Sequence, residues 1–183
     1  KQQILKLGAE AESSVRLAVK SLLERDSELA KKVIEKDNDI DSFEVEIEED
    51  CLKTLALHQP VAVDLRFIVA VLKINNDLER IGDLAVNIAE RQVIISKKRE
   101  TDFPPGLEEM SEKAQIMLRK SLESLINMDS KTARDVMLMD DDLDDLNSKI
   151  YDKVKEAIRK KPEHLTSMVQ FLTIARNLER IGD

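Results

Sequence analysis

Lys73-Ile-Asn-Asn-Asp-Leu-Glu-Arg-Ile-Gly-Asp83 is the stretch around which the chain is organised, and a second version of it ends the sequence as Thr173-Ile-Ala-Arg-Asn-Leu-Glu-Arg-Ile-Gly-Asp183. Leu-Glu-Arg-Ile-Gly-Asp is identical in the two copies. Each copy carries two carboxylates spaced i, i+4, which are Glu79 with Asp83 and Glu179 with Asp183. On a helix this spacing places both groups on one face, about 6 Å apart along the axis. Such neighbours repel each other unless positive charge lies between them.

The likeness between the two halves extends beyond this motif. At one offset, Asp26-Ser27 aligns with Asp129-Ser130, and Asp37 and Asp41 align with Asp140 and Asp144. The motif copies lie at a slightly shorter offset, and the difference falls near Pro60 and Pro162, where a turn between helices tolerates a change in length. The chain is therefore a duplication of one helical unit.

The composition predicts an all-α protein. The 183 residues include 42% hydrophobic and 36% charged residues, with only four Gly, four Pro and no Trp. Few helix breakers and many charges are typical of helical proteins. The net charge of −8 argues against a nucleic-acid partner, which would require a basic face, and favours cations or basic partner surfaces. The single cysteine, Cys51, is predicted to be a core residue and is compatible with a reducing cytoplasm.

The apolar periodicity predicts three long helices and one short helix in each half. In the first half these cover about 2–25, a short helix through Lys36, a helix from Ile40 to about His58, and one from Val63 to about Lys98. The linker is Thr101-Asp-Phe-Pro-Pro-Gly106, since two prolines and a glycine cannot continue a helix. The predicted domains are 1–100 and 107–183. The second is incomplete, because its motif copy stops at Asp183, and we expect the natural protein to continue.

In the second half, the first helix is expected to bury one stripe of residues. These are Met110, Ala114, Met117, Ser121 and Leu125.

The turn at Pro60 predicts which carboxylates meet in the first half. Short connections make successive helices antiparallel neighbours, so depth can be counted outward from the turn. Glu79 and Asp41 lie equally far from Pro60, and so do Asp83 and Asp37. Counting from Pro162 places Glu179 and Asp183 level with Asp145 and Asp141, within a residue of Asp144 and Asp140. Four carboxylates are therefore expected to converge in each half.

Carboxylates that share a half-buried site must protonate or be neutralised by cations. An all-oxygen cage suits hard ions such as Mg²⁺, Mn²⁺, Ca²⁺ or iron, with room for more than one ion per site. A surface lattice of ion pairs with Arg80 and Arg180 is the alternative, and spacing does not decide between them. Asp37 and Asp140 have a further interpretation as helix N-caps. Gly82 and Gly182, which are costly inside a helix, indicate close approach of a neighbouring helix or a ligand.

Sequence motifs for other chemistry are missing. His58 and His164 are predicted at turns and complete no Glu-x-x-His pair, which argues against ferritin-like oxygen chemistry. The sequence contains no glycine-rich phosphate loop, nucleophile elbow or Cys/His metal spacing.

The run from Asn76 to Glu90, which reads Asn-Asp-Leu-Glu-Arg-Ile-Gly-Asp-x-Ala-x-Asn-Ile-Ala-Glu and begins again at Asn177, resembles the signature of the PhoU family. That family comprises accessory regulators of bacterial phosphate-specific transport. The resemblance spans the whole chain. It implies a pair of three-helix bundles, each with a short extra helix, that form homodimers.

The resemblance also implies a metal-binding function. The family's Glu/Asp-x-x-x-Asp motifs hold clusters of iron, zinc, manganese or magnesium, and they correspond here to Glu79 with Asp83 and Glu179 with Asp183. By the same resemblance the expected ligands extend to Asp37, Asp41, Asp140 and Asp144. It implies a cytoplasmic adaptor, peripheral to the inner membrane, that represses phosphate uptake and starvation signalling through the phosphate ABC transporter and its sensor histidine kinase. No catalysis is expected. A phosphatase-like, carboxylate-bridged metalloenzyme and a metal-free helical scaffold are the competing hypotheses.

Overall fold

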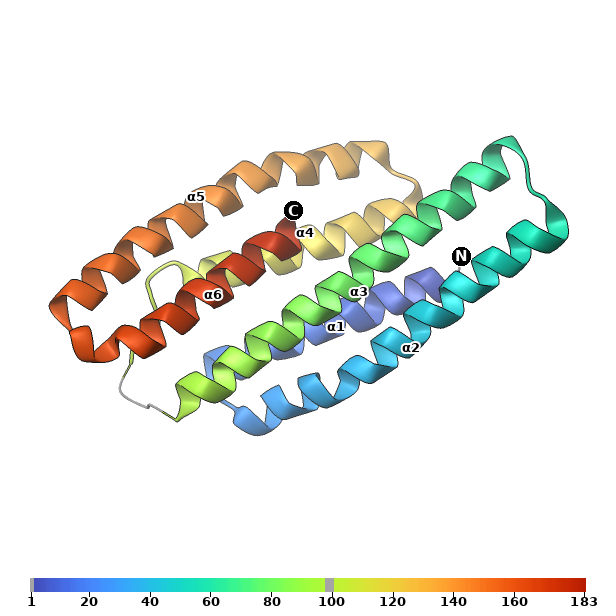
Figure 1. Cartoon of the computed structure of the whole chain (residues 1–183). Coiled ribbons are helices and arrows are strands. Elements are labelled where there is room, and N and C mark those ends of the chain that lie inside the picture. Colours follow the sequence, from blue (N-terminus) through green and yellow to red (C-terminus); the bar gives the residue numbers. More distant parts are fainter. Residues whose placement is uncertain (1, 98–100) are drawn as a thin grey trace.

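The computed structural model describes residues 2–97 and 101–183, and this part of the chain forms α-helices without a strand (Figure 1). The elements are α1 (Gln2–Glu24), α2 (Ser27–His58), α3 (Ala62–Ser96), α4 (Leu107–Asn127), α5 (Ser130–Lys160), the 3-10 turn η1 (Pro162–His164) and α6 (Leu165–Gly182). The all-α prediction is confirmed. The predicted end of α3 at Lys98 and the domain limits at residues 1 and 100 lie outside the described residues.

The predicted short extra helix is not a separate element. α2 runs unbroken from Ser27 to His58, and α5 runs unbroken from Ser130 to Lys160. Asp37-Asn38-Asp39 was expected to interrupt the first of these. Asp and Asn cost at most about 0.7 kcal/mol each inside a helix, and the buried side chains of Val33 and Ile40, seven residues apart, keep one apolar face continuous across the segment. Burial of that face outweighs the weak local preference for a break.

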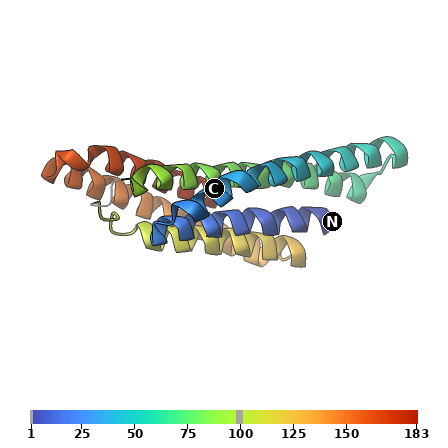
Figure 2. The same cartoon turned by 90° about the horizontal axis from the view of Figure 1, so that it is seen from below.

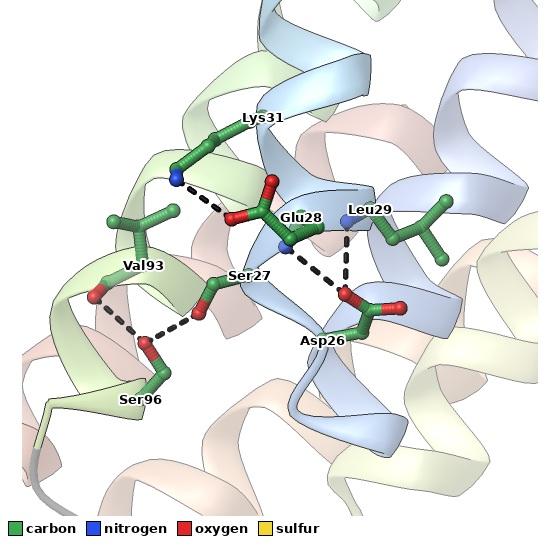
Figure 3. Close-up of polar contacts among 7 residues, drawn as sticks. All are labelled: Asp26, Ser27, Glu28, Leu29, Lys31, Val93 and Ser96. Atoms are coloured by element: carbon green, nitrogen blue, oxygen red, sulfur yellow. Dashed lines mark hydrogen bonds and ion pairs between the residues drawn. The ribbon is translucent and has the colours of Figure 1, made fainter.

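The Asp-Ser pairs that mark the repeat begin the second helix of each half, as the sequence predicts. Asp26 Oδ1 accepts hydrogen bonds from the backbone N–H groups of Glu28 and Leu29, each at 3.0 Å (Figure 3). Figure 3 also shows the Ser27 hydroxyl donating to Ser96 Oγ at 2.8 Å, which ties the start of α2 to the end of α3. Asp129 caps α5 in the same way through the N–H groups of Lys131 and Thr132.

Removing this cap gives a first testable prediction. Asp26→Ala leaves two backbone N–H groups without an acceptor and is expected to lower the free energy of unfolding by about 1 kcal/mol. Asp39→Ala is the matched control, because Asp39 is exposed in the interior of α2 and Ala is the better helix former. Urea unfolding followed by circular dichroism measures both. Equal stability of the two variants would contradict the capping role.

The two halves pack side by side, and the larger of two buried apolar clusters runs through both of them. α1, α2 and α3 form one bundle, α4, α5 and α6 form the other, and the halves meet where α3 packs on α6 and α1 on α4. Figure 2 shows α1 and α4 neighbouring each other in a layer below α3 and α6. The core cluster joins all six helices through residues such as Leu22, Ala30, Ile88, Met117, Leu143 and Phe171. The linker 101–106 is non-helical, as predicted.

The α2–α3 hairpin projects beyond the start of α1 (Figure 1). It carries exposed apolar side chains. Leu57, Val61 and Val63 are 77%, 74% and 74% exposed. We call these three residues the apolar tip. Contiguous apolar side chains in water are typical of contact surfaces. Within the described residues, no helix combines the length and the apolar character that a membrane span requires.

Candidate metal centres

α2 and α3 bring the four predicted carboxylates of the first half to one level, and we call Asp37, Asp41, Glu79 and Asp83 the first centre. The two helices approach closely beside Gly82. A Cβ atom added there would lie 3.1 Å from Ile40 Cδ1 and 3.6 Å from Asp37 Oδ1. The expectation that this glycine permits close helix contact is confirmed. Gly182 repeats the arrangement, since a Cβ there would meet the Leu143 side chain of α5.

Electrostatic interactions couple the carboxylates of the first centre across α2 and α3. Burial, followed by repulsion from Asp41 and Asp83, raises the pKa of Asp37. Burial also raises the pKa of Glu79, and next in order come the charges of Asp83 and Asp41. Negative charges from both helices therefore act on each half-buried carboxyl group, which favours a cation at this position.

The second centre comprises Asp140, Asp144, Glu179 and Asp183, between α5 and α6. Carboxylate oxygens of Asp144, Glu179 and Asp183 all lie within 4.8 Å of one another, the only such trio among the described residues. Burial, then repulsion from Asp183 and Asp144, raises the pKa of Glu179. Burial, then Asp144 and Asp183, likewise raises the pKa of Asp140. The aspartate that meets the motif is thus Asp144 rather than its neighbour Asp145, which the count from Pro162 had placed level with Glu179.

The two centres repeat one pattern of exposure. Each has a half-buried glutamate from the motif and a half-buried aspartate from the opposite helix, Glu79 with Asp37 and Glu179 with Asp140. The other two carboxylates of each centre are exposed. Each centre is therefore anchored on its protein side and open to solvent on the other, so an ion could enter without unfolding the bundle.

The donor set fits a hard metal ion. Asp140 Oδ1 is buried and has no hydrogen-bond partner, so a carboxylate oxygen of the second centre lacks the compensation that burial requires. Every candidate ligand atom in both centres is a carboxylate oxygen. Oxygen ligands of this kind suit magnesium, manganese, calcium and iron, whereas zinc more often takes nitrogen and sulfur.

Two alternative interpretations of these carboxylates, as helix N-caps and as partners of arginine, can be compared with the structure. Asp37 and Asp140 lie inside α2 and α5, so the N-cap interpretation is wrong; the caps are Asp26 and Asp129. In the described part of the chain, no ion pair joins Arg80 or Arg180 to a carboxylate. Arg176 does lower the pKa of Glu179, but less than burial and the neighbouring aspartates raise it. Among the described residues, these two arginines therefore form no ion-pair lattice with the centres, which was the alternative to a metal ion.

The structure adds one carboxylate that was not among the predicted ligands. Glu44 lies three residues after Asp41 on α2, and its charge contributes to raising the pKa of Glu79. The Asn75 side-chain N–H group donates to Glu44 Oε1 at 3.1 Å and to the Glu44 carbonyl at 2.9 Å. The sequence places Glu44 on the same side of α2 as Asp41. Its contact with the buried Asn75 lies between two helices, so spacing within one helix could not show it.

Other predicted positions are as follows. His58 is the last residue of α2 and His164 belongs to η1, so both lie at turns, as expected. Cys51 is half-buried rather than fully buried, and burial raises the pKa of its thiol. Ser121 was expected in the core but is exposed on α4.

Comparison with known proteins places this chain in a family. The PhoU domain model matches residues 4–92 and again 107–183. The phosphate-specific transport system accessory protein PhoU homolog of Aquifex aeolicus is 34% identical, with 98% of this chain and 81% of that protein covered. Homolog 1 of Methanothermobacter thermautotrophicus is 37% identical over 92% of this chain and 77% of its own length.

Solved structures agree. The crystal structure of PhoU from Pseudomonas aeruginosa matches with a TM-score of 0.96 and 31% identity, over all of this chain and 88% of that one. The phosphate transport system regulatory protein PhoU from Streptococcus pneumoniae matches with a TM-score of 0.88 and 28% identity, over 100% and 86%. Each of the two matched segments carries one copy of the motif. The chain belongs to the PhoU family of phosphate transport accessory proteins.

Proposed function

We propose that this protein is a metal-binding adaptor that represses phosphate uptake and phosphate-starvation signalling. In this proposal it acts in the cytoplasm, as a homodimer at the inner membrane, on the phosphate ABC transporter and its sensor histidine kinase. The observation that carries the proposal is the match along the whole chain to proteins named as accessory or regulatory components of phosphate transport. The two carboxylate centres supply the metal-binding part.

The metal would act as a cross-link between helices. Asp37 and Asp41 of α2 face Glu79 and Asp83 of α3, so an ion held by both pairs would fix the distance between the two helices. The bound ion supplies positive charge that offsets the repulsion described above. Manganese, magnesium or iron is the expected occupant of a set of oxygen ligands. The adaptor would then present a surface whose shape depends on metal loading.

An adaptor explains the residues better than a phosphatase does. The two histidines lie at turns and not at the carboxylate centres, so the candidate proton acceptors there are the carboxylates themselves. The apolar tip, in contrast, is the kind of surface that binds another protein. These features support regulation by contact and not by turnover.

A reporter experiment tests this function. Deletion of the gene is expected to raise expression of a phosphate-starvation phosphatase reporter at high external phosphate, because the repressor is missing. The wild-type chain restored in trans should return expression to its basal level and should co-purify with the transporter ATPase or the kinase. Unchanged reporter expression in the deletion strain at high phosphate would refute the proposal.

A further inference from the structure

A cavity of about 310 Å³ lies where the linker 101–106 passes the turn between α5 and α6 (Figure 1). The linker, α5, η1 and α6 all contribute to its lining. We call it the linker cavity. Its volume reaches the lower limit of sites that hold small organic molecules, about 300 Å³. Among the described residues that line it, none belongs to the first or the second centre.

Apolar side chains form one part of the lining. They are Phe103, Pro104, Val154, Ala157 and Met168. Met168 is buried, and the Phe103 ring is held edge to face against the buried Phe171, with centroids 5.4 Å apart. The fixed ring of proline further restricts the linker at Pro104. The apolar lining is therefore in place before a ligand arrives, which lowers the cost of binding.

The polar part of the lining is mostly basic. It comprises Lys153, Lys160, Lys161 and His164, against the single carboxylate of Asp102. The chain as a whole carries a net charge of −8, so this group of lysines runs against the charge of the molecule. The linker cavity therefore favours an anionic ligand.

The end of α5 explains only part of this positive charge. Lys160 is the last residue of α5 and Lys161 is its C-cap, where cations are favoured on any helix. Lys160 Nζ also lies 2.7 Å from Glu156 Oε1, so its charge is already paired. The corresponding turn of the first half reads Ala56-Leu-His-Gln-Pro-Val61 and contains no lysine. The fold of the hairpin therefore does not require these charges.

Two ammonium groups of the lining are available to a ligand. Among the described residues, Lys161 forms no ion pair. Lys153 lies about two turns before the end of α5, and its Nζ donates to the Pro105 carbonyl at 3.3 Å. An ammonium group has three donors, so this bond positions Lys153 beside the linker and leaves two N–H groups free.

The charges and the apolar lining together select the class of ligand. Lysine binds phosphate as a point charge, and two ammonium groups match a doubly charged phosphate better than a single carboxylate. Inorganic phosphate would leave the apolar lining unused, whereas Phe103 and Met168 suit an aromatic ring. We propose that the linker cavity binds a small phosphate ester with an aromatic body, such as a mononucleotide. Lys153 and Lys161 hold its phosphate group, and Phe103 and Met168 contact its ring.

This site goes beyond the proposed adaptor function and uses none of the metal ligands. A ligand that contacts both Lys153 and Phe103 joins α5 to the linker between the two halves. It binds the folded chain and not the unfolded one, so it is expected to raise the thermal unfolding midpoint. The linker cavity would thereby let a small phosphorylated molecule act on the connection between the two bundles.

Calorimetric titration of the full chain with adenosine monophosphate and with phenyl phosphate, in the presence of EDTA, tests the proposal. Both are expected to bind with a Kd below about 1 mM. Lys153→Gln and Lys161→Gln should each weaken binding roughly tenfold, the loss typical of a hydrogen bond to a charged group. Both lysines are exposed, so the variants should keep the wild-type circular dichroism spectrum. Lys155→Gln, which removes an exposed lysine of α5 outside the cavity, is the matched control and should bind as the wild type does.

Partial ligands separate the two contributions. Inorganic phosphate lacks the apolar body and adenosine lacks the charge, so each is expected to bind at least about tenfold more weakly than adenosine monophosphate. Absence of binding for both esters at millimolar concentration would overturn the proposal. Equal affinity for inorganic phosphate, or wild-type affinity in the Lys153 and Lys161 double variant, would overturn it too. Phosphatidylglycerol vesicles that bind through these lysines while both esters fail would assign the lysines to a membrane surface instead.

Discussion

The double change of Glu79→Gln with Asp83→Asn is expected to abolish metal binding at the first centre and leave the helical content intact. Both amides keep the shape of the side chain but remove the charge that holds a hard cation. Saturating metal at one hundred times its Kd stabilises a one-site protein by about 2.7 kcal/mol, and the variant should lose the share of this effect that belongs to the first centre. Elemental analysis of purified protein and thermal unfolding with and without EDTA measure the two effects.

The sign of the effect on metal-free protein provides an internal check. Repulsion from Asp83 and Asp41 acts on Glu79 when no cation is bound. Removing two of these charges is therefore expected to make the EDTA-treated variant at least as stable as the EDTA-treated wild type. A side-chain pair with a purely structural role would instead lose stability in both conditions.

The matched control removes the same charge elsewhere on the first half. Asp39→Asn with Glu46→Gln neutralises two exposed carboxylates of α2 that lie outside the first centre, and it should retain full metal content. Glu179→Gln with Asp183→Asn is the counterpart for the second centre. Metal content that stays unchanged in the Glu79 and Asp83 double variant would defeat the assignment of the first centre.

Phe171→Ala is expected to destabilise the protein by about 3 to 5 kcal/mol, the largest loss predicted for any single side chain here. Phe171 is fully buried in the core that joins the two halves. Its ring meets that of Phe103 edge to face, with centroids 5.4 Å apart, and the Arg25 guanidinium carbon lies 4.9 Å from the Phe103 centroid. Removing the ring opens a cavity and also frees the linker segment that carries Phe103.

Urea unfolding followed by circular dichroism measures this loss. Phe171→Leu should be intermediate, because it restores part of the lost volume. Leu57→Ala, in the apolar tip, should change stability by less than about 0.5 kcal/mol, since that side chain is 77% exposed. A loss below about 1 kcal/mol for Phe171→Ala would show that the two halves fold without a common core.

Much of each centre could be predicted because it depends on spacing within one hairpin. Glu79 and Asp83 share a helix face through the i, i+4 rule, and Pro60 sets the level at which Asp41 and Asp37 meet them. These distances are set by the rise of the helix and by a short turn. For the second centre, the count from Pro162 was wrong by one residue. The turn there contains the 3-10 segment η1, whose rise per residue differs from that of an α-helix.

The predictions that failed needed information from outside the local sequence. A break at Asp37-Asn38-Asp39 is a reasonable local preference, yet burial of Val33 and Ile40 on one face overrides it. Ser121 lies on the apolar period of α4, but it is exposed at that level of the helix. Periodicity identifies a face of a helix and does not state what packs against it.

By itself the sequence determined the all-helical class, the duplication, the Asp-Ser caps and the i, i+4 carboxylate pairs, because each depends on covalent geometry and on neighbours within a few turns. Only the tertiary structure decided that α3 lies against α6 and that one core cluster runs through both halves. The physical reason is that the rotation of one bundle against the other is set by how buried side chains of both halves interlock. The spacing of residues within either half does not specify that rotation.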